Sequence, residues 1–77
     1  MNAYITLEAD VYKEDATGRL IVRYTPILRP GTLASGELRF ATWECPLLDG
    51  ANAHRETMRD AIESARNAIQ TIAREVA

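Results

Sequence analysis

A single cysteine, a single histidine and three carboxylates are the residues of this chain whose types and spacing could do chemistry. Cys45 precedes His54, and Asp49, Glu56 and Asp60 flank the histidine. A thiol beside an imidazole can form a nucleophile–base pair, and grouped carboxylates can bind a cation or transfer protons. None of these residues has the spacing of a zinc or calcium motif. We therefore predict no catalytic residue, no metal site and no cofactor, and we expect a protein that is not an enzyme.

Ordinary structural roles account for the same residues. His54 stands in a polar stretch ahead of an expected helix, which is typical of a solvated loop histidine. Cys45 ends an expected strand, and we interpret it as a half-buried structural thiol. Nothing in the sequence holds His54 near that thiol. Asp60 is explained by a place in the first turn of a helix, where the helix dipole favours a carboxylate.

Length and charge limit the classes of protein that this chain can represent. Its 77 residues predict one domain, residues 1–77, because a chain of this size buries only about 60% of its unfolded surface. Lys and Arg number 9 against 11 Asp and Glu, which is not the basic composition of a typical nucleic-acid-binding protein. The N-terminus lacks a signal-peptide pattern, and no apolar run approaches the roughly 20 residues that span a bilayer. We predict a cytoplasmic protein with no membrane segment.

Three stretches have the alternation and the composition of strands: residues 3–12, 19–28 and 37–45. The intervening residues 13–18 and 29–36 carry the Gly, Pro and acidic residues of turns. In residues 37–45 the apolar side chains do not all fall on one face of the expected strand. A β-bulge, or a strand covered on both faces, would explain this pattern. Pro26 lacks a backbone donor, so we expect it at a strand end or on an edge strand.

The last third of the chain has the periodicity of an amphipathic helix of about five turns. Thr57 followed by Asp60 matches the spacing of a capping box, so we expect the helix to begin there. Apolar residues then recur at steps of four and three: Met58, Ile62, Ala65, Ile69, Ile72 and Val76. The predicted fold is α+β with two layers. A three-stranded antiparallel sheet (β-β-β-α) has one long C-terminal helix packed on one face.

The stretch between residues 36 and 72 resembles the HicB-like antitoxin family. Counted from Pro46, the family register places a Gly, a capping Thr and a helix with small residues, which here are Gly50, Thr57, Ala61, Ala65 and the pair Ala68-Ile69. The helix DAIESARNAI follows the family style, in which small residues let the helix lie close to a sheet. The chain departs from the family where a Leu-Pro-Gly-Cys turn is replaced by Leu48-Asp49-Gly50-Ala51. The C-terminal DNA-binding segment of many members has no counterpart before Ala77, so no DNA-binding role is carried over.

The resemblance implies a partial ribonuclease-H-like fold without the ribonuclease carboxylates. It also implies a function in protein recognition, because the family domain covers the catalytic surface of a small basic toxin that cleaves RNA. We accordingly expect a protein-binding module that masks a small basic protein partner. The predicted contact surface comprises the loop of residues 46–56 and the exposed helix face, with Asp49, His54, Arg55, Glu56 and Glu63 as contact residues.

Two other functions stay open. Arg23, Arg39 and Trp43 could stack and bind single-stranded nucleic acid on an open sheet face. The chain could also be a phage- or plasmid-type accessory protein that inhibits some other host machinery. Independently of these, a sheet with one uncovered face or edge predicts a homodimer.

Overall fold

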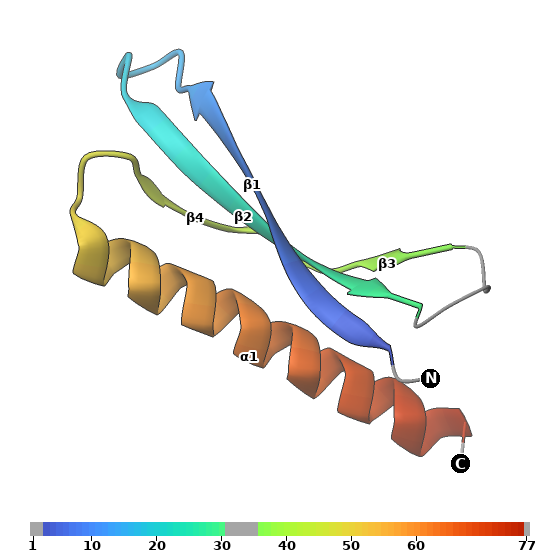
Figure 1. Ribbon diagram of the computed structural model, residues 1–77. Coiled ribbons are helices and arrows are strands. Elements are labelled where there is room, and N and C mark those ends of the chain that lie inside the picture. The colour runs from blue at the N-terminus through green and yellow to red at the C-terminus, as the bar shows by residue number, and fades with distance from the viewer. Residues whose placement is uncertain (1–2, 31–35, 77) are drawn as a thin grey trace.

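The computed structural model describes residues 3–30 and 36–76 and has an α+β fold. Its elements are β1 (Tyr4–Lys13), β2 (Leu20–Arg29), β3 (Leu38–Arg39), β4 (Trp43–Pro46) and α1 (Ala51–Val76). The strands form one antiparallel sheet, and the long C-terminal helix lies along one face of it (Figure 1). The predicted fold class is therefore confirmed.

The long hairpin of β1 and β2 organises the sheet. Its register runs without a break from Tyr4 opposite Arg29 to Lys13 opposite Leu20. The connecting turn is closed by a backbone hydrogen bond from Gly18 to Glu14 of 2.8 Å. Gly18 has a φ of 72°, a conformation that side chains disfavour. β2 is the central strand, because β3 and β4 pair with its opposite edge.

The expected third strand, residues 37–45, is split into β3 and β4 by a bulge. Leu28 lies opposite Leu38 at one end of β2, whereas Val22 lies opposite Cys45 at the other end. Between these two pairs, the segment that runs from β3 to β4 contains one residue more than the facing segment of β2. An extra residue on one of two paired strands is a β-bulge. The ambiguous alternation of that stretch is thereby explained. In the turn expected at 29–36, residues 31–35 lie outside the described residues.

The position of Pro26 differs from the prediction. It lies inside the central strand β2, opposite Leu7, and it is buried. Phe40 donates a backbone hydrogen bond to the carbonyl of Pro26 at 3.0 Å. Because the nitrogen and carbonyl of a strand residue point to the same side, the Pro26 nitrogen faces the interruption between β3 and β4. The missing donor therefore falls where the neighbouring strand is irregular.

The buried residues lie on both faces of β2. Val22, Pro26 and Cys45 lie on the face that the middle of α1 crosses, whereas Ile21 and Ile27 lie on the other face, with Arg23 and Arg39. Two alanines of the helix, Ala61 and Ala65, are fully buried, and their small side chains let the helix approach the strands. The buried apolar set is short, as expected for a chain of this size: Ile21, Val22, Ile27, Cys45, Ala61 and Ala65, together with Pro26. Much of the stability must therefore come from contacts at the margin of this core.

The helix begins earlier than predicted. Gly50, with a φ of 90°, precedes it, and the amide of His54 donates to the carbonyl of Gly50 at 3.3 Å. Thr57 does not cap the helix, because its hydroxyl donates within α1 to the carbonyl of Ala53 at 2.8 Å. The polar run ahead of Thr57 was wrongly assigned to a loop. Its residues form the first turns of α1 because His54 is anchored on the sheet.

Candidate functional site

His54 joins the start of α1 to the sheet. Its Nδ1 lies 2.8 Å from the hydroxyl of Tyr24 and 3.3 Å from the Sγ of Cys45. Its Nε2 lies 2.9 Å from the carbonyl oxygen of Leu47. The Tyr24 and His54 rings meet edge to face, with centroids 5.9 Å apart. The interpretation of His54 as a solvated loop residue is therefore wrong.

The hydrogen-bond partners assign the tautomer of the imidazole. A carbonyl can only accept, so Nε2 carries the proton and donates to Leu47. In the neutral ring, Nδ1 is then an acceptor, and the Tyr24 hydroxyl donates to it. The Cys45 thiol is a second, weaker donor to the same nitrogen. Burial, and to a smaller extent the neighbouring Cys45, raise the pKa of Tyr24, which favours this protonated phenol.

The same geometry limits what the Cys45–His54 pair can do. A thiol within hydrogen-bond reach of an imidazole is the arrangement needed to activate a nucleophile. Here the side chain of Cys45 is only 7% exposed, so a substrate has little access to the sulfur. Nδ1 also accepts the stronger bond from Tyr24. The structure brings together two residues that the sequence did not connect, and their contacts fasten α1 to β2 and β4.

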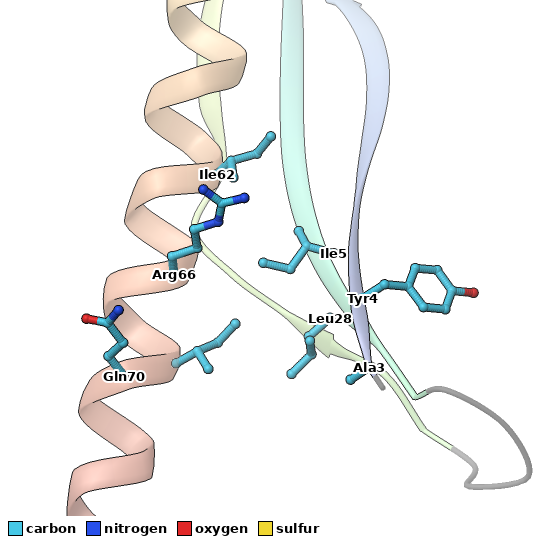
Figure 2. A pocket seen from close by; sticks show the side chains of 8 residues that line it. Ala3, Tyr4, Ile5, Leu28, Ile62, Arg66 and Gln70 are labelled. Atoms are coloured by element: carbon cyan, nitrogen blue, oxygen red, sulfur yellow. The ribbon is translucent and has the colours of Figure 1, made fainter. Parts of the chain in front are cut away.

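A groove opens between the C-terminal half of α1 and the free edge of the sheet (Figure 2). Its volume is about 590 Å³, and its lining residues are Ala3, Tyr4, Ile5, Leu28, Ile62, Arg66, Ile69 and Gln70. Ile5 of β1 and Ile62 of α1 point into the space between helix and sheet, whereas the ring of Tyr4 points to the other face. The groove is therefore mainly aliphatic, and the sequence missed it because its walls lie far apart along the chain.

A second surface surrounds Trp43 at the opposite edge of the sheet. Trp43 is 39% exposed and lines two adjoining hollows shared with α1. Their other lining residues are Ala41, Thr42, Glu44, Asp60, Glu63, Ser64 and Asn67. We call this set the Trp43 patch. It contains no Lys or Arg. Glu44 lies opposite Arg23 on the other face of the sheet, so the carboxylates on the side of Trp43 are those of Asp60 and Glu63. Neither of these two forms a salt bridge with another described residue.

The sheet face opposite the helix is occupied by paired charges. Arg23 binds Asp10 at 3.0 Å, and Arg39 binds Glu8 at 3.2 Å. The hydrogen bond from Arg23 lowers the pKa of Asp10. Arg23 also lies over the ring of Tyr12, 4.7 Å from its centroid. These arginines are therefore engaged within the sheet.

The nucleic-acid surface expected from the sequence is not assembled. Trp43 lies opposite Tyr24 in the register, on the face that α1 covers, whereas Arg23 lies opposite Glu44 on the other face. Arg39 lies opposite Ile27, on the face of Arg23. The extra residue of the bulge puts Trp43 on the helix-covered face, away from the two arginines. The three residues therefore do not form one stacking platform.

The predicted partner contacts divide into two groups. Asp49, Arg55 and Glu56 are exposed around the start of α1, and Glu63 is exposed within the Trp43 patch. Around Arg55 and Glu56 the charges are mixed, because Arg59 lines the same hollow. His54 is half-buried, and both of its ring nitrogens already have partners. Of the predicted set, only Glu63 therefore belongs to a surface of one charge sign.

No protein-family model, curated protein or solved structure matches this chain. Across residues 3–30 and 36–76, no three side chains of His, Cys, Asp or Glu gather closely enough to hold a metal ion. Over the same residues, no helix has the length and apolarity needed to cross a bilayer. The Trp43 patch, the groove and the His54 contacts are thus the features on which a functional proposal can rest.

Proposed function

We propose that this protein is a cytoplasmic, non-catalytic binding module that masks a small basic protein, in the manner of HicB-like antitoxins. The observation that carries the proposal is the Trp43 patch. It combines a partly exposed tryptophan with the carboxylates of Asp60 and Glu63, and no basic side chain lines it. The whole chain is also slightly acidic, because Asp and Glu outnumber Lys and Arg.

The composition of the patch suits protein recognition. Tryptophan is enriched among the few residues that dominate binding energy at interfaces. Carboxylates around such an anchor accelerate the encounter with a basic partner and disfavour acidic ones. Trp43 is a residue of β4, and the hollow that it shares with α1 leaves its side chain accessible to a partner.

A recognition function agrees with the environment of the potentially reactive groups. The Cys45 thiol is buried, and its neighbour His54 is bonded at both ring nitrogens. Masking a toxin requires a surface and no reactive group. The resemblance over residues 36–72 supplies the specific expectation that the partner cleaves RNA.

The test is affinity capture of the tagged protein from its host, with nuclease treatment and mass spectrometry of the eluate. We expect a small basic protein that survives nuclease treatment and is lost with Trp43→Ala and with Glu63→Gln. Glu75→Gln is the matched control, because it removes one exposed carboxylate from the same helix outside the patch. Each variant is first checked for folding by circular dichroism.

The captured partner is then assayed for RNA cleavage with and without this protein. Inhibition of cleavage supports the antitoxin-like role. A partner without ribonuclease activity would instead identify an inhibitor of other machinery. Capture that disappears with nuclease, or that persists unchanged in Trp43→Ala, would refute the proposed surface.

A further inference from the structure

We propose that the free edge of β1 pairs with β1 of a second copy, giving a two-fold homodimer with a continuous sheet. Among the described strands only β2 pairs with β1, and it does so along one side. α1 contacts β1 less than it contacts β2 or β4, so the helix does not cover this edge. β1 thus presents ten residues in an unbroken extended register.

The backbone groups available for pairing can be assigned from the register. The carbonyl of Pro26 accepts from Phe40 and so points away from β1. Pro26 lies opposite Leu7, and Leu7 therefore directs its own N–H and C=O to the free edge. Because the direction of these backbone groups alternates along a strand, the N–H and C=O groups of Ile5, Ala9 and Val11 also point to the free edge. None of these residues is a proline or is charged, and β1 pairs with β2 without a bulge, so the edge lacks those two devices against pairing. The charges of β1 are those of Glu8, Asp10 and Lys13.

The carboxylates of β1 select one register. A two-fold axis at Leu7 puts Thr6 opposite Glu8 of the other copy and Tyr4 opposite Asp10. An axis at Glu8 or Ala9 would instead oppose two carboxylates, which is destabilising. The register at Leu7 is the longest that avoids this clash.

The apolar surfaces of the two ends of β1 complement each other in this register. Val11 is 53% exposed at the hairpin end, where α1 does not reach. Ala3 and Ile5 line the groove at the other end. Pairing at Leu7 brings Val11 and Ala9 of one copy beside Ala3 and Ile5 of the other, at the mouth of the groove. Each copy therefore supplies an uncovered aliphatic strand end and an aliphatic groove, which is why a second copy is the occupant.

The experiment is sedimentation equilibrium of the native chain and of two matched variants over a roughly hundredfold range of concentration. Thr6→Glu opposes a carboxylate to Glu8 of the partner, and the clash occurs twice because of the two-fold axis. Within one copy the new carboxylate is compatible with Arg29, whose Nε donates to the Thr6 hydroxyl at 3.0 Å. Thr6→Gln has the same shape without the charge. We expect the dimer dissociation constant to rise about tenfold or more for Thr6→Glu and to change little for Thr6→Gln.

Ala9→Pro tests the backbone pairing separately. Its lost N–H points to the free edge, so the β1–β2 ladder keeps its hydrogen bonds, and thermal unfolding checks that the fold persists. We expect this variant to be monomeric. A native chain that sediments as a monomer throughout, or a dimer that persists in both Thr6→Glu and Ala9→Pro, would overturn the proposal. The Trp43 patch lies on the opposite edge, so Trp43→Ala should leave the dimer intact and keeps the two proposals independent.

Discussion

The contacts of His54 should make it one of the most important residues for stability outside the core. His54→Ala removes the hydrogen bond to Leu47 and the acceptor for the Tyr24 hydroxyl. Each bond contributes about 0.5–1.5 kcal/mol, and a partly buried hydroxyl without a partner adds to the loss. We therefore expect the free energy of unfolding to fall by about 2–3 kcal/mol. A domain of 77 residues has a total of roughly 4–12 kcal/mol, so this loss is a large fraction.

Urea unfolding, followed by the fluorescence of Trp43 and by far-UV circular dichroism, measures this change. Tyr24→Phe keeps the ring and removes one hydrogen bond, so it should cost about 1 kcal/mol. The double variant should lose less than the sum of the single losses, with a coupling of about 0.5–1.5 kcal/mol between the two residues. Arg55→Ala is the control, because Arg55 is an exposed neighbour in the same turn of α1.

A loss below about 0.5 kcal/mol for His54→Ala, equal to that of the Arg55 control, would contradict this reasoning. It would mean that the contacts with Tyr24 and Leu47 do not hold in solution. The start of α1 would then be frayed towards Thr57, where the capping pattern had predicted the helix to begin. A change in the urea dependence of the unfolding free energy would point to the same conclusion, because it reports a change in the surface exposed on unfolding.

Other substitutions test the packing, the charges and the turn. Ala65→Leu adds volume at a fully buried position and should lower the unfolding free energy by about 1–3 kcal/mol, whereas Ala73→Leu at an exposed position should be nearly neutral in the same urea titration. Arg23 lowers the pKa of Asp10. The stabilisation from this pair is therefore complete above about pH 4 and is lost as the pH falls through the lowered pKa. In Asp10→Asn, the melting temperature should consequently fall less steeply at acidic pH than it does in the native protein. Gly50→Ala should cost about 1–2 kcal/mol in thermal unfolding, because the φ of 90° is strained for any side chain even though space is free.

The individual elements could be predicted because each has a local signal. Strict alternation defined residues 3–12, and the β-branched and aromatic composition defined 19–28, to within a residue or so of β1 and β2. The irregular alternation of 37–45 also marked the bulge, since one extra residue moves every later side chain to the other face. Small residues at Ala61 and Ala65 indicated a helix packed closely on a sheet, and both are fully buried.

The candidate sites depended on contacts between distant residues and could not be predicted in the same way. The start of α1 was misplaced because His54, a polar residue in a polar run, gains partners from β2 and from the turn after β4. Pro26 was expected at an edge, yet it is central because the neighbouring strand is interrupted beside it. Trp43 was grouped with Arg23 and Arg39, but the bulge places Trp43 on the other face of the sheet.

The sequence by itself determined the fold class, the order of the elements and the faces of the first two strands, because hydrophobic periodicity acts on neighbours along the chain. It also determined the slightly acidic charge balance. Only the tertiary structure decided which polar residues meet. It placed Cys45, Tyr24 and His54 together, set Asp60 and Glu63 beside Trp43, and left one edge of β1 without a partner among the described strands. Each of these depends on strand register and on the crossing of α1 over the sheet, where a shift of one residue exchanges the side chains that face each other.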